Sequence, residues 1–381
     1  MVTTPTVGTA PARPPEVRAG AAPTALRALG VFAAVRGAGV LVVALGAWWC
    51  GRDPLRVLGG SWDSVWYLGI ASHGYGRTQM WATGSIQSDH AFFPLYPLLV
   101  RLAGGTSLAA LAVAWTAAAL AAVGVYRVGE HLLGARAGVL LVALWASLPH
   151  AVVLTLGYTE ALLTALAAWA LYALLRGHWR AATGLAVLAG LTRPTGIAVA
   201  AAVTAMAVRE LLRGRGTPRV WAAALLAPAG WAAYVLAVGA HRHDPFGYFA
   251  VQRQWGSRFD FGAGTLASVE KVLTGGNVPF ATTVAVAVLA TAGLLAAGLV
   301  LDRTPLPLLA YTGTLLLITF GGAGFFESKP RFLLPAFPLL LPLAAVMARA
   351  RPRTAVVVTA CLAGLSYGYG VYLLLVAHVP P

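Results

Sequence analysis

The chain has 381 residues, of which 59% are hydrophobic and 10% are charged, and its formal net charge is +15. Soluble domains carry about 25% charged residues, and apolar stretches of bilayer length follow one another here almost without interruption, which excludes a soluble domain. The basic residues are scattered through short loops, so they fit the positive-inside bias of membrane proteins and exclude a nucleic-acid-binding face.

Residues 1–27 are rich in Pro, Thr and Ala and predict a disordered cytoplasmic tail. Residues 28–381 are expected to form a single all-α polytopic domain in the cell membrane, because helices satisfy the backbone polar groups in hydrocarbon. The basic loops place the N-terminus in the cytoplasm. Nine full spans are predicted, near residues 31–50, 107–127, 137–156, 160–175, 220–240, 278–301, 306–324, 332–348 and 354–378.

The apolar segment 181–208 has basic clusters on both sides, so a single crossing would put one cluster outside. It is interrupted by Thr192-Arg193-Pro194-Thr195-Gly196, in which proline breaks the helical hydrogen-bond ladder and glycine relaxes it. We therefore expect a broken, re-entrant helix pair that enters and returns, with Arg193 at its tip. The alternative is one long span.

The first outer loop, residues 51–106, contains a helical pattern over residues 60–71. Apolar residues recur on one side of this segment, and Asp63, Ser64 and Tyr67 fall on the other. The pattern predicts an interfacial helix whose tryptophans lie among lipid headgroups. Asp63 is in its first turn, where the helix dipole favours a carboxylate. The alternative is that Asp63 only caps the helix.

Farther along this loop, Asp89 and His90 precede an aromatic run punctuated by prolines, residues 92–99, which includes Tyr96. Aromatic groups beside carboxylates suit a pocket for a lipid-linked polar group, although the same aromatics would also anchor a loop to the membrane. Asp89-His90 resembles half of a metal site. Two residues do not define one, so a divalent metal ion stays possible with its ligands unknown.

Glu160 follows Tyr158-Thr159 at a tight outer turn between two predicted spans. A carboxylate at that depth is costly unless it is paired or functional, and Arg193 is a candidate partner or phosphate ligand. The second outer loop, residues 241–277, adds Gln252, Trp255 and Arg258, a mixture of stacking and hydrogen-bonding groups that suits a sugar or a headgroup.

Lys329 and Arg331 stand at the predicted outer entry to a span, against the usual inward bias of basic residues. Two cations in this position would attract a lipid phosphate. The alternative for Lys329 and Arg331 is ordinary snorkelling of basic side chains at a helix end. The alternative for Glu160 and Arg193 is an ion pair with a purely structural role.

In order along the chain, these motifs resemble the GT-C glycosyltransferases that use polyprenyl-phosphate sugars. Within them the chain looks most like the bacterial relatives of the enzyme that adds the second mannose to the GPI anchor, the PIG-V type. The motifs that carry the resemblance are Trp62-Asp63-Ser64-Val65-Trp66-Tyr67, Phe92-Phe93-Pro94-Leu95-Tyr96-Pro97, Tyr158-Thr159-Glu160, Thr192-Arg193-Pro194-Thr195-Gly196 and Lys329-Pro330-Arg331-Phe332.

The resemblance implies a GT-C-like fold and transfer of a sugar, mannose in the PIG-V type, from a polyprenyl-phosphate donor to a hydroxyl on a lipid or cell-envelope glycan at the extracytoplasmic face. Asp63 matches the first-loop aspartate that serves as the base in this family. The family often has a second acidic residue close by, whereas the next one here is Asp89. Other classes remain as alternatives: a transporter or flippase of lipid-linked sugars, or a non-catalytic membrane scaffold.

Overall fold

The computed structural model describes residues 21–80, 86–275 and 277–377. Of the tail predicted over residues 1–27, residues 1–20 lie outside the described ranges. Helix α1 begins at Ala21, so residues 21–27 are helical rather than disordered. In the described part, two small antiparallel sheets interrupt the helices. Strand β1 (Thr78–Met80) pairs with β2 (Ile86–Ser88), and β3 (Arg258–Phe259) pairs with β4 (Gly322–Ala323).

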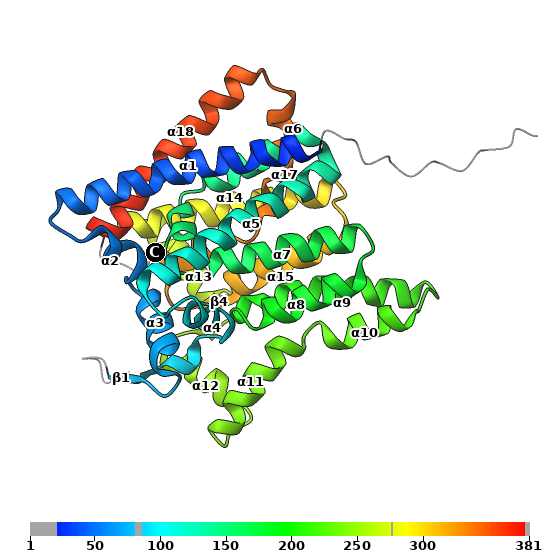
Figure 1. The fold of residues 1–381 in the computed structure, drawn as a ribbon, viewed down its shortest axis with the longest axis horizontal. Coiled ribbons are helices and arrows are strands. Elements are labelled where there is room, and N and C mark those ends of the chain that lie inside the picture. The colour runs from blue at the N-terminus through cyan, green and yellow to red at the C-terminus, as the bar shows by residue number, and fades with distance from the viewer. Residues whose placement is uncertain (1–20, 81–85, 276, 378–381) are drawn as a thin grey trace, which may run out of the picture.

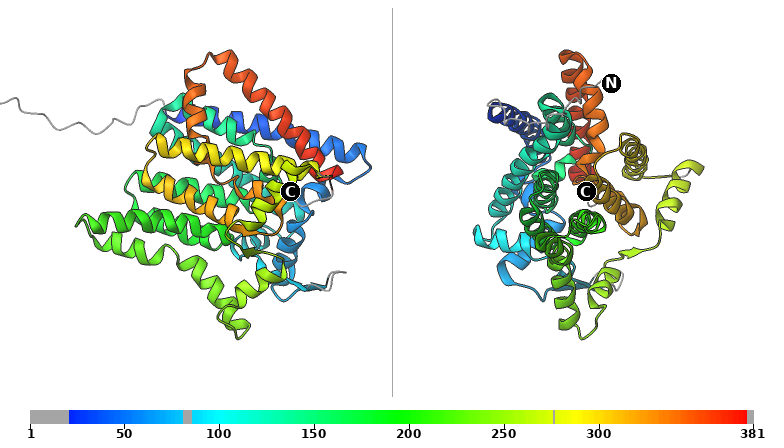
Figure 2. Two further views of the ribbon diagram at one scale, coloured as in Figure 1. Left: turned by 180° about the vertical axis from the view of Figure 1, so that it is seen from behind. Right: turned by 90° about the vertical axis from the view of Figure 1, so that its right-hand side faces the viewer.

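The main body is a bundle of helices that lie roughly parallel or antiparallel to one another (Figures 1 and 2). Alanine and glycine fill many of its contacts, as between Gly124 and Ala168, and small residues let membrane helices approach closely. The bundle helices are α1 (Ala21–Trp49), α5 (Ser107–Leu133), α6 (Ala135–Ala146), α7 (Glu160–Leu175), α8 (Trp179–Gly190), α9 (Ile197–Leu212), α10 (Pro218–Leu226), α11 (Ala229–His241), α14 (Phe280–Leu301), α15 (Leu306–Gly321), α17 (Leu341–Arg349) and α18 (Pro352–Val371).

The described helices include six that are long and apolar enough to cross a bilayer: Thr24–Trp49, Ser107–Leu133, Pro194–Leu212, Pro218–His241, Phe280–Leu301 and Pro352–Val376. A seventh would be the pair Phe326–Phe332 and Phe337–Arg349, which is bent by 76°. The nine predicted full spans are therefore not confirmed. Residues 137–156, 160–175 and 306–324 contain only shorter apolar helices. Helices α6 and α15 end before the predicted bounds, at Ala146 and Gly321, whereas α7 has the predicted bounds and is simply short, with 16 residues.

The break predicted at Arg193-Pro194 is present. Helix α8 ends at Gly190, a turn of 3-10 helix covers Pro194–Gly196, and α9 runs back beside α8. Backbones are in close contact here: a Cβ on Gly196 would lie 1.9 Å from the carbonyl oxygen of Ala189. The returning arm, Pro194–Leu212, is long enough to span a bilayer, so it exceeds the short re-entrant arm that we expected.

The connections divide between the two ends of the bundle. The α5–α6, α7–α8, α9–α10, α14–α15 and α17–α18 connections lie at one end, on the right in Figure 1. The basic clusters that predicted cytoplasmic loops fall there, so we call it the arginine-rich end. The opposite end, called the Asp63 end, holds the helices α2 (Pro54–Gly59), α3 (Asp63–His73), α4 (Leu95–Leu102), α12 (Gly247–Gln254), α13 (Ala263–Thr274) and α16 (Lys329–Phe332).

We expect Gly196→Ala to destabilise the α8–α9 hairpin by about 1–3 kcal/mol, the usual cost of overpacking, because the new methyl group meets backbone. Gly184→Ala is the matched control: Gly184 is in the interior of α8 with open space around it, so alanine there should stabilise the helix by about 0.5–1 kcal/mol. Thermal unfolding in detergent measures both changes. Equal melting temperatures for the two variants would contradict the close contact at Gly196.

Candidate active site

Asp63 is the first residue of α3, and an unusual backbone precedes it. Trp62 has φ 52° and ψ −120°, a conformation that costs energy for any residue except glycine. The Asp63 amide donates a hydrogen bond to the hydroxyl of Tyr158 (3.3 Å) from the distant α7 turn. These constraints fix the position of the Asp63 carboxylate, and strain of this kind clusters at functional sites.

Two carboxylates and two guanidinium groups form a chain of ion pairs, called here the Asp63–Arg193 cluster. Arg331 Nη2 lies 2.8 Å from Asp63 Oδ2, and Arg331 Nε lies 3.8 Å from Glu160 Oε1. Glu160 Oε1 is in turn 2.5 Å from Arg193 Nη1. The side chain of Asp63 is 23% exposed and that of Glu160 only 2%, so Asp63 is the carboxylate that faces outward.

The cluster is neutral overall, yet its hydrogen bonding is incomplete. Within the described part of the chain, several buried atoms of the cluster have no hydrogen-bond partner: Arg331 Nε and Nη1, Arg193 Nε and Glu160 Oε2. Both guanidinium groups also lie 5.3 Å from the ring of Phe332, a cation–π distance. Buried donors without partners are costly unless a ligand or water satisfies them, so the cluster has capacity to bind a polar group.

A first cavity of about 650 Å³ opens beside Asp63. Its lining combines carboxylates, guanidinium groups, amides and aromatic rings, a mixture that suits a sugar, whose hydroxyls need hydrogen bonds and whose ring faces can stack. The lining residues that carry this chemistry are Trp62, Asp63, Trp66, Tyr67, Gln79, Gln87, Phe92, Arg193, Gln252, Trp255, Glu327 and Arg331. The aromatic wall is closely packed, with Trp255 5.1 Å from Trp66 and 5.2 Å from Phe92.

A second cavity of about 620 Å³ shares Arg193, Gln252 and Phe332 with the first. Its lining holds four cations, Arg193, Arg253, Arg258 and Lys329, and no carboxylate. The Lys329 ammonium donates to the Thr265 hydroxyl (2.5 Å) and to the Gly322 carbonyl (2.6 Å). Since an ammonium has three N–H groups, one remains for a ligand. This cavity is suited to an anion.

Two buried tyrosines, Tyr67 and Tyr158, lie next to the Asp63–Arg193 cluster. Burial, followed by the nearby Asp63 carboxylate, raises the pKa values of Tyr67 and Tyr158 above the usual value for tyrosine. Both phenols therefore stay protonated at physiological pH and act as hydrogen-bond donors or acceptors. At this wall of the first cavity, Asp63 is therefore the group that can accept a proton.

Most of the residues predicted for the site come together. Asp63, Arg193, Gln252, Trp255 and Arg331 line the first cavity. Arg258 and Lys329 line the second. Glu160 is not in the lining of either cavity, and its two arginine partners connect it to them. Asp89, His90 and Tyr96 are not in the lining of either cavity.

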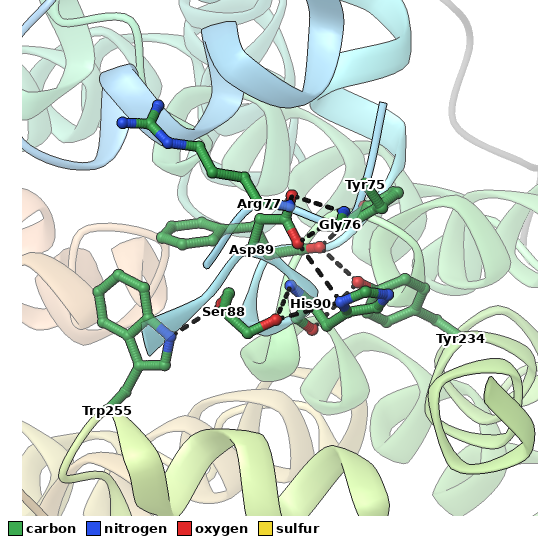
Figure 3. Close-up of polar contacts among 9 residues, drawn as sticks. Tyr75, Gly76, Arg77, Ser88, Asp89, His90, Tyr234 and Trp255 are labelled. Carbon is green, nitrogen blue, oxygen red and sulfur yellow. Dashed lines mark hydrogen bonds and ion pairs between the residues drawn. The ribbon is translucent and has the colours of Figure 1, made fainter. Parts of the chain in front are cut away.

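Asp89 holds the first loop together instead (Figure 3). It is 1% exposed, and its carboxylate accepts hydrogen bonds from the amides of Gly76 (3.0 Å) and Arg77 (2.8 Å), with His90 Nδ1 at 3.3 Å. Burial alone would raise the pKa of Asp89, but the bonds from His90 and the two amides outweigh it and lower this pKa below its usual value.

Tyr96 and the α3 helix also differ from expectation. Tyr96 is fully buried and its hydroxyl donates to the Ala110 carbonyl (2.9 Å), so it packs α4 onto α5. On α3, Ser64, Trp66 and Tyr67 are all buried inside the protein, because the loop folds over them. The prediction that Trp66 lies among headgroups is therefore wrong.

Glu327 and Phe332 were not predicted as site residues. Glu327 lines the first cavity, where its Oε1 accepts from the Thr282 hydroxyl (2.8 Å). The position of Glu327 two residues before the Lys329-Pro330-Arg331 motif could have indicated that it belongs to the site. Among the residues that the structure describes, no group of three or more His, Cys, Asp or Glu could hold a metal ion.

We expect Asp89→Asn to destabilise the loop around Gly76 and His90 by about 1.5–3 kcal/mol, because a carboxylate that accepts several hydrogen bonds is lost. Hydrogen exchange of residues 74–80 and 86–93 measures the change. Asp53→Asn is the control, since Asp53 is exposed and asparagine caps α2 equally well. Equal protection in both variants would contradict this role.

The low pKa of Asp89 also sets the pH dependence of the loop. Because the pKa of Asp89 is lower in the folded state than in the unfolded state, the ionised carboxylate stabilises the fold. This stability is complete above the pKa of the unfolded state, about 4, and is lost as the pH falls through the pKa of the folded state. Wild-type protection of the loop should therefore persist at pH 5 and decline only in stronger acid. The Asp89→Asn variant should lack this step.

No protein-family model and no curated protein matches the chain. Among solved structures it is similar to ArnT from Cupriavidus metallidurans bound to undecaprenyl phosphate, with 15% identity, a TM-score of 0.53, and coverage of 92% of this chain and 67% of that chain. The apo state of ArnT matches with 17% identity, a TM-score of 0.50, and coverage of 90% and 66%. The chain thus spans about two thirds of the length of ArnT.

At these identities the likeness shows the fold. The expected GT-C-like architecture is confirmed at the level of an ArnT-like fold. The chain is a multi-pass membrane protein with an ArnT-like GT-C fold.

Proposed function

We propose that the chain is a membrane glycosyltransferase that moves a sugar from a polyprenyl-phosphate donor to an acceptor hydroxyl. One observation carries the proposal: Asp63, held by Arg331, faces a cavity suited to a sugar, and a cavity lined by four cations adjoins it. ArnT, which has the same fold, binds undecaprenyl phosphate.

The donor phosphate is assigned to the second cavity. Lys329 has an unused N–H there, and its two hydrogen bonds go to neutral oxygens. The Asp260 carboxylate is close enough to interact with its charge but forms no ion pair with it among the described residues, so the ammonium can still meet a ligand. Arg258 lines the same cavity and is exposed. By contrast, the charge of Arg331 is already balanced by Asp63. Cations at the leaving phosphate stabilise the negative charge that develops on it.

The sugar is assigned to the first cavity, next to the wall that both cavities share. Arg193, Gln252 and Phe332 form that wall, so a donor whose phosphate lies on one side can place its anomeric carbon on the other. Trp255 and Gln252 then offer a stacking face and an amide to the sugar. The acceptor hydroxyl enters on the Asp63 side.

The reaction follows from this arrangement. The acceptor oxygen attacks the anomeric carbon, the bond from that carbon to the phosphate oxygen breaks, and the polyprenyl phosphate leaves. Asp63 accepts the proton of the acceptor hydroxyl. Its Oδ2 is bound to Arg331, so Oδ1 is assigned as the proton acceptor. A phosphate is a good leaving group, so the reaction needs no strong general acid.

The finer assignments rest on the sequence motifs. Mannose as the sugar follows from the resemblance to the PIG-V type. A glycan or lipid acceptor also follows from that resemblance. The extracytoplasmic face follows from the basic clusters, which gather at the end opposite Asp63 and would face the cytoplasm.

Transfer from labelled polyprenyl-phosphate mannose in membranes tests the proposal. Asp63→Asn should lower kcat by about 10²–10⁴-fold, the usual contribution of a general base, with normal folding. Glu327→Gln is the comparator, because it removes the other carboxylate of the first cavity while sparing the ion pairs of Asp63. It should change activity far less.

Three results would contradict the proposal. Equal transfer by wild type and Asp63→Asn would remove Asp63 as the base. Loss of transfer in Glu327→Gln alone would move the base to Glu327. Movement of intact lipid-linked sugar across vesicles by the wild type, with no transfer of any tested sugar, would favour a transporter.

A further inference from the structure

A separate cavity of about 930 Å³ opens between α1, α6 and α18 at the arginine-rich end of the bundle. At this end α18 diverges from α1, as Figures 1 and 2 show. Its walls are aliphatic and include Val31, Val139, Leu140 and Val356. We call this cavity the far groove, because the Asp63 end is at the other side of the bundle.

Arginines surround the mouth of the far groove. Arg27 on α1 and Arg136 on α6 line it, and both are exposed. Arg136 Nη2 donates to the Ala350 carbonyl (2.6 Å), which ties it to the turn that carries Arg351 and Arg353. In the described residues none of these four arginines forms an ion pair with a carboxylate.

The nearby carboxylate is already engaged. Glu130 is in the last turn of α5, which packs on both α1 and α6. Its carboxylate accepts from the Tyr126 hydroxyl (2.7 Å) and pairs with Arg127 (2.9 Å). The mouth of the groove therefore keeps a net positive charge.

Another positive charge, on Arg36, lies behind the inner wall of the groove. Tyr367 lines the groove, and its hydroxyl donates to the carbonyl of Val35 (2.6 Å). The next residue, Arg36, is 3% exposed; its Nη1 reaches the Ala146 carbonyl (3.3 Å) and its Nε has no hydrogen-bond partner. An arginine buried in a membrane helix is costly, so an anion close to it lowers that cost.

We propose that the far groove binds an anionic glycerophospholipid. Its phosphate lies between Arg27 and Arg136, which donate from two different helices, and an acyl chain follows the aliphatic walls. Two other occupants do not match the charge. Residues 1–20 of the chain carry Arg13 and Arg18 against one acid, Glu16. A second copy would bring the same arginines to the contact.

The test uses the full chain in detergent, titrated with phosphatidylglycerol or with the zwitterionic phosphatidylcholine. Melting temperature and native mass spectrometry report binding. Phosphatidylglycerol should stabilise the wild type more than phosphatidylcholine does. Arg27→Gln combined with Arg136→Gln should weaken phosphatidylglycerol binding by about 30-fold, which corresponds to about fivefold for each arginine.

Two further variants locate the site. Arg176→Gln combined with Arg180→Gln removes two exposed arginines at the same end, on the α7–α8 turn, and should leave binding unchanged. Val356→Trp fills the groove and keeps its arginines; Val356 is 68% exposed, so the fold should tolerate the change. This variant should lose the lipid.

Several results would overturn the proposal. Equal stabilisation by the two lipids would remove the role of headgroup charge. Equal losses in the two double arginine variants would mean that total charge matters and the groove does not. Retained binding in Val356→Trp would place the lipid outside the groove. A dimer that dissociates in Val356→Trp, with no bound lipid in the wild type, would identify the groove as an interface between two copies.

Discussion

The Arg331 guanidinium joins the parts of the molecule on which the site depends. It pairs with Asp63 at the start of α3 and approaches Glu160 at the start of α7, while Glu160 pairs with Arg193 in the break between α8 and α9. Four segments distant in sequence thus meet through one chain of alternating charges. Buried charges of this kind are stable only as a complete set, because removal of one partner leaves another uncompensated.

This arrangement explains why two cavities of different character lie side by side. In the Asp63–Arg193 cluster, each arginine is balanced by a carboxylate, and the cluster is neutral. Lys329 is in the same short helix as Arg331, but its hydrogen bonds go to neutral oxygens and it lines the cavity on the other side of Phe332, with Asp260 as the nearby carboxylate. A four-residue helix therefore supplies one cation that holds Asp63 and one that can meet a phosphate.

The sequence predicted which residues gather at the candidate site better than it predicted how they pack. Motif order and the bias of basic loops placed Asp63, Glu160, Arg193, Lys329 and Arg331 at the same end of the molecule. Helical periodicity could not reveal that the loop folds over Trp66 and Tyr67, because burial against a distant loop leaves no local pattern.

Asp89 and Tyr96 show the same limit. In the sequence, Asp89 followed by His90 resembles part of a metal site. In the structure, the Asp89 carboxylate instead accepts hydrogen bonds from backbone amides, which come close to it only in the folded loop. Span counting failed for a related reason. Hydropathy does not report where α6 and α15 end, nor that the helical segments Phe326–Phe332 and Phe337–Arg349 are bent by 76° relative to each other.

A structure of the full chain with undecaprenyl phosphate tests the central claim most directly, namely that one arginine holds the base while the neighbouring lysine binds the phosphate. The account predicts a phosphate oxygen within hydrogen-bond distance of Lys329 Nζ, with the Arg331–Asp63 contact intact. A phosphate bound to Arg331, with Asp63 released from it, would contradict the account.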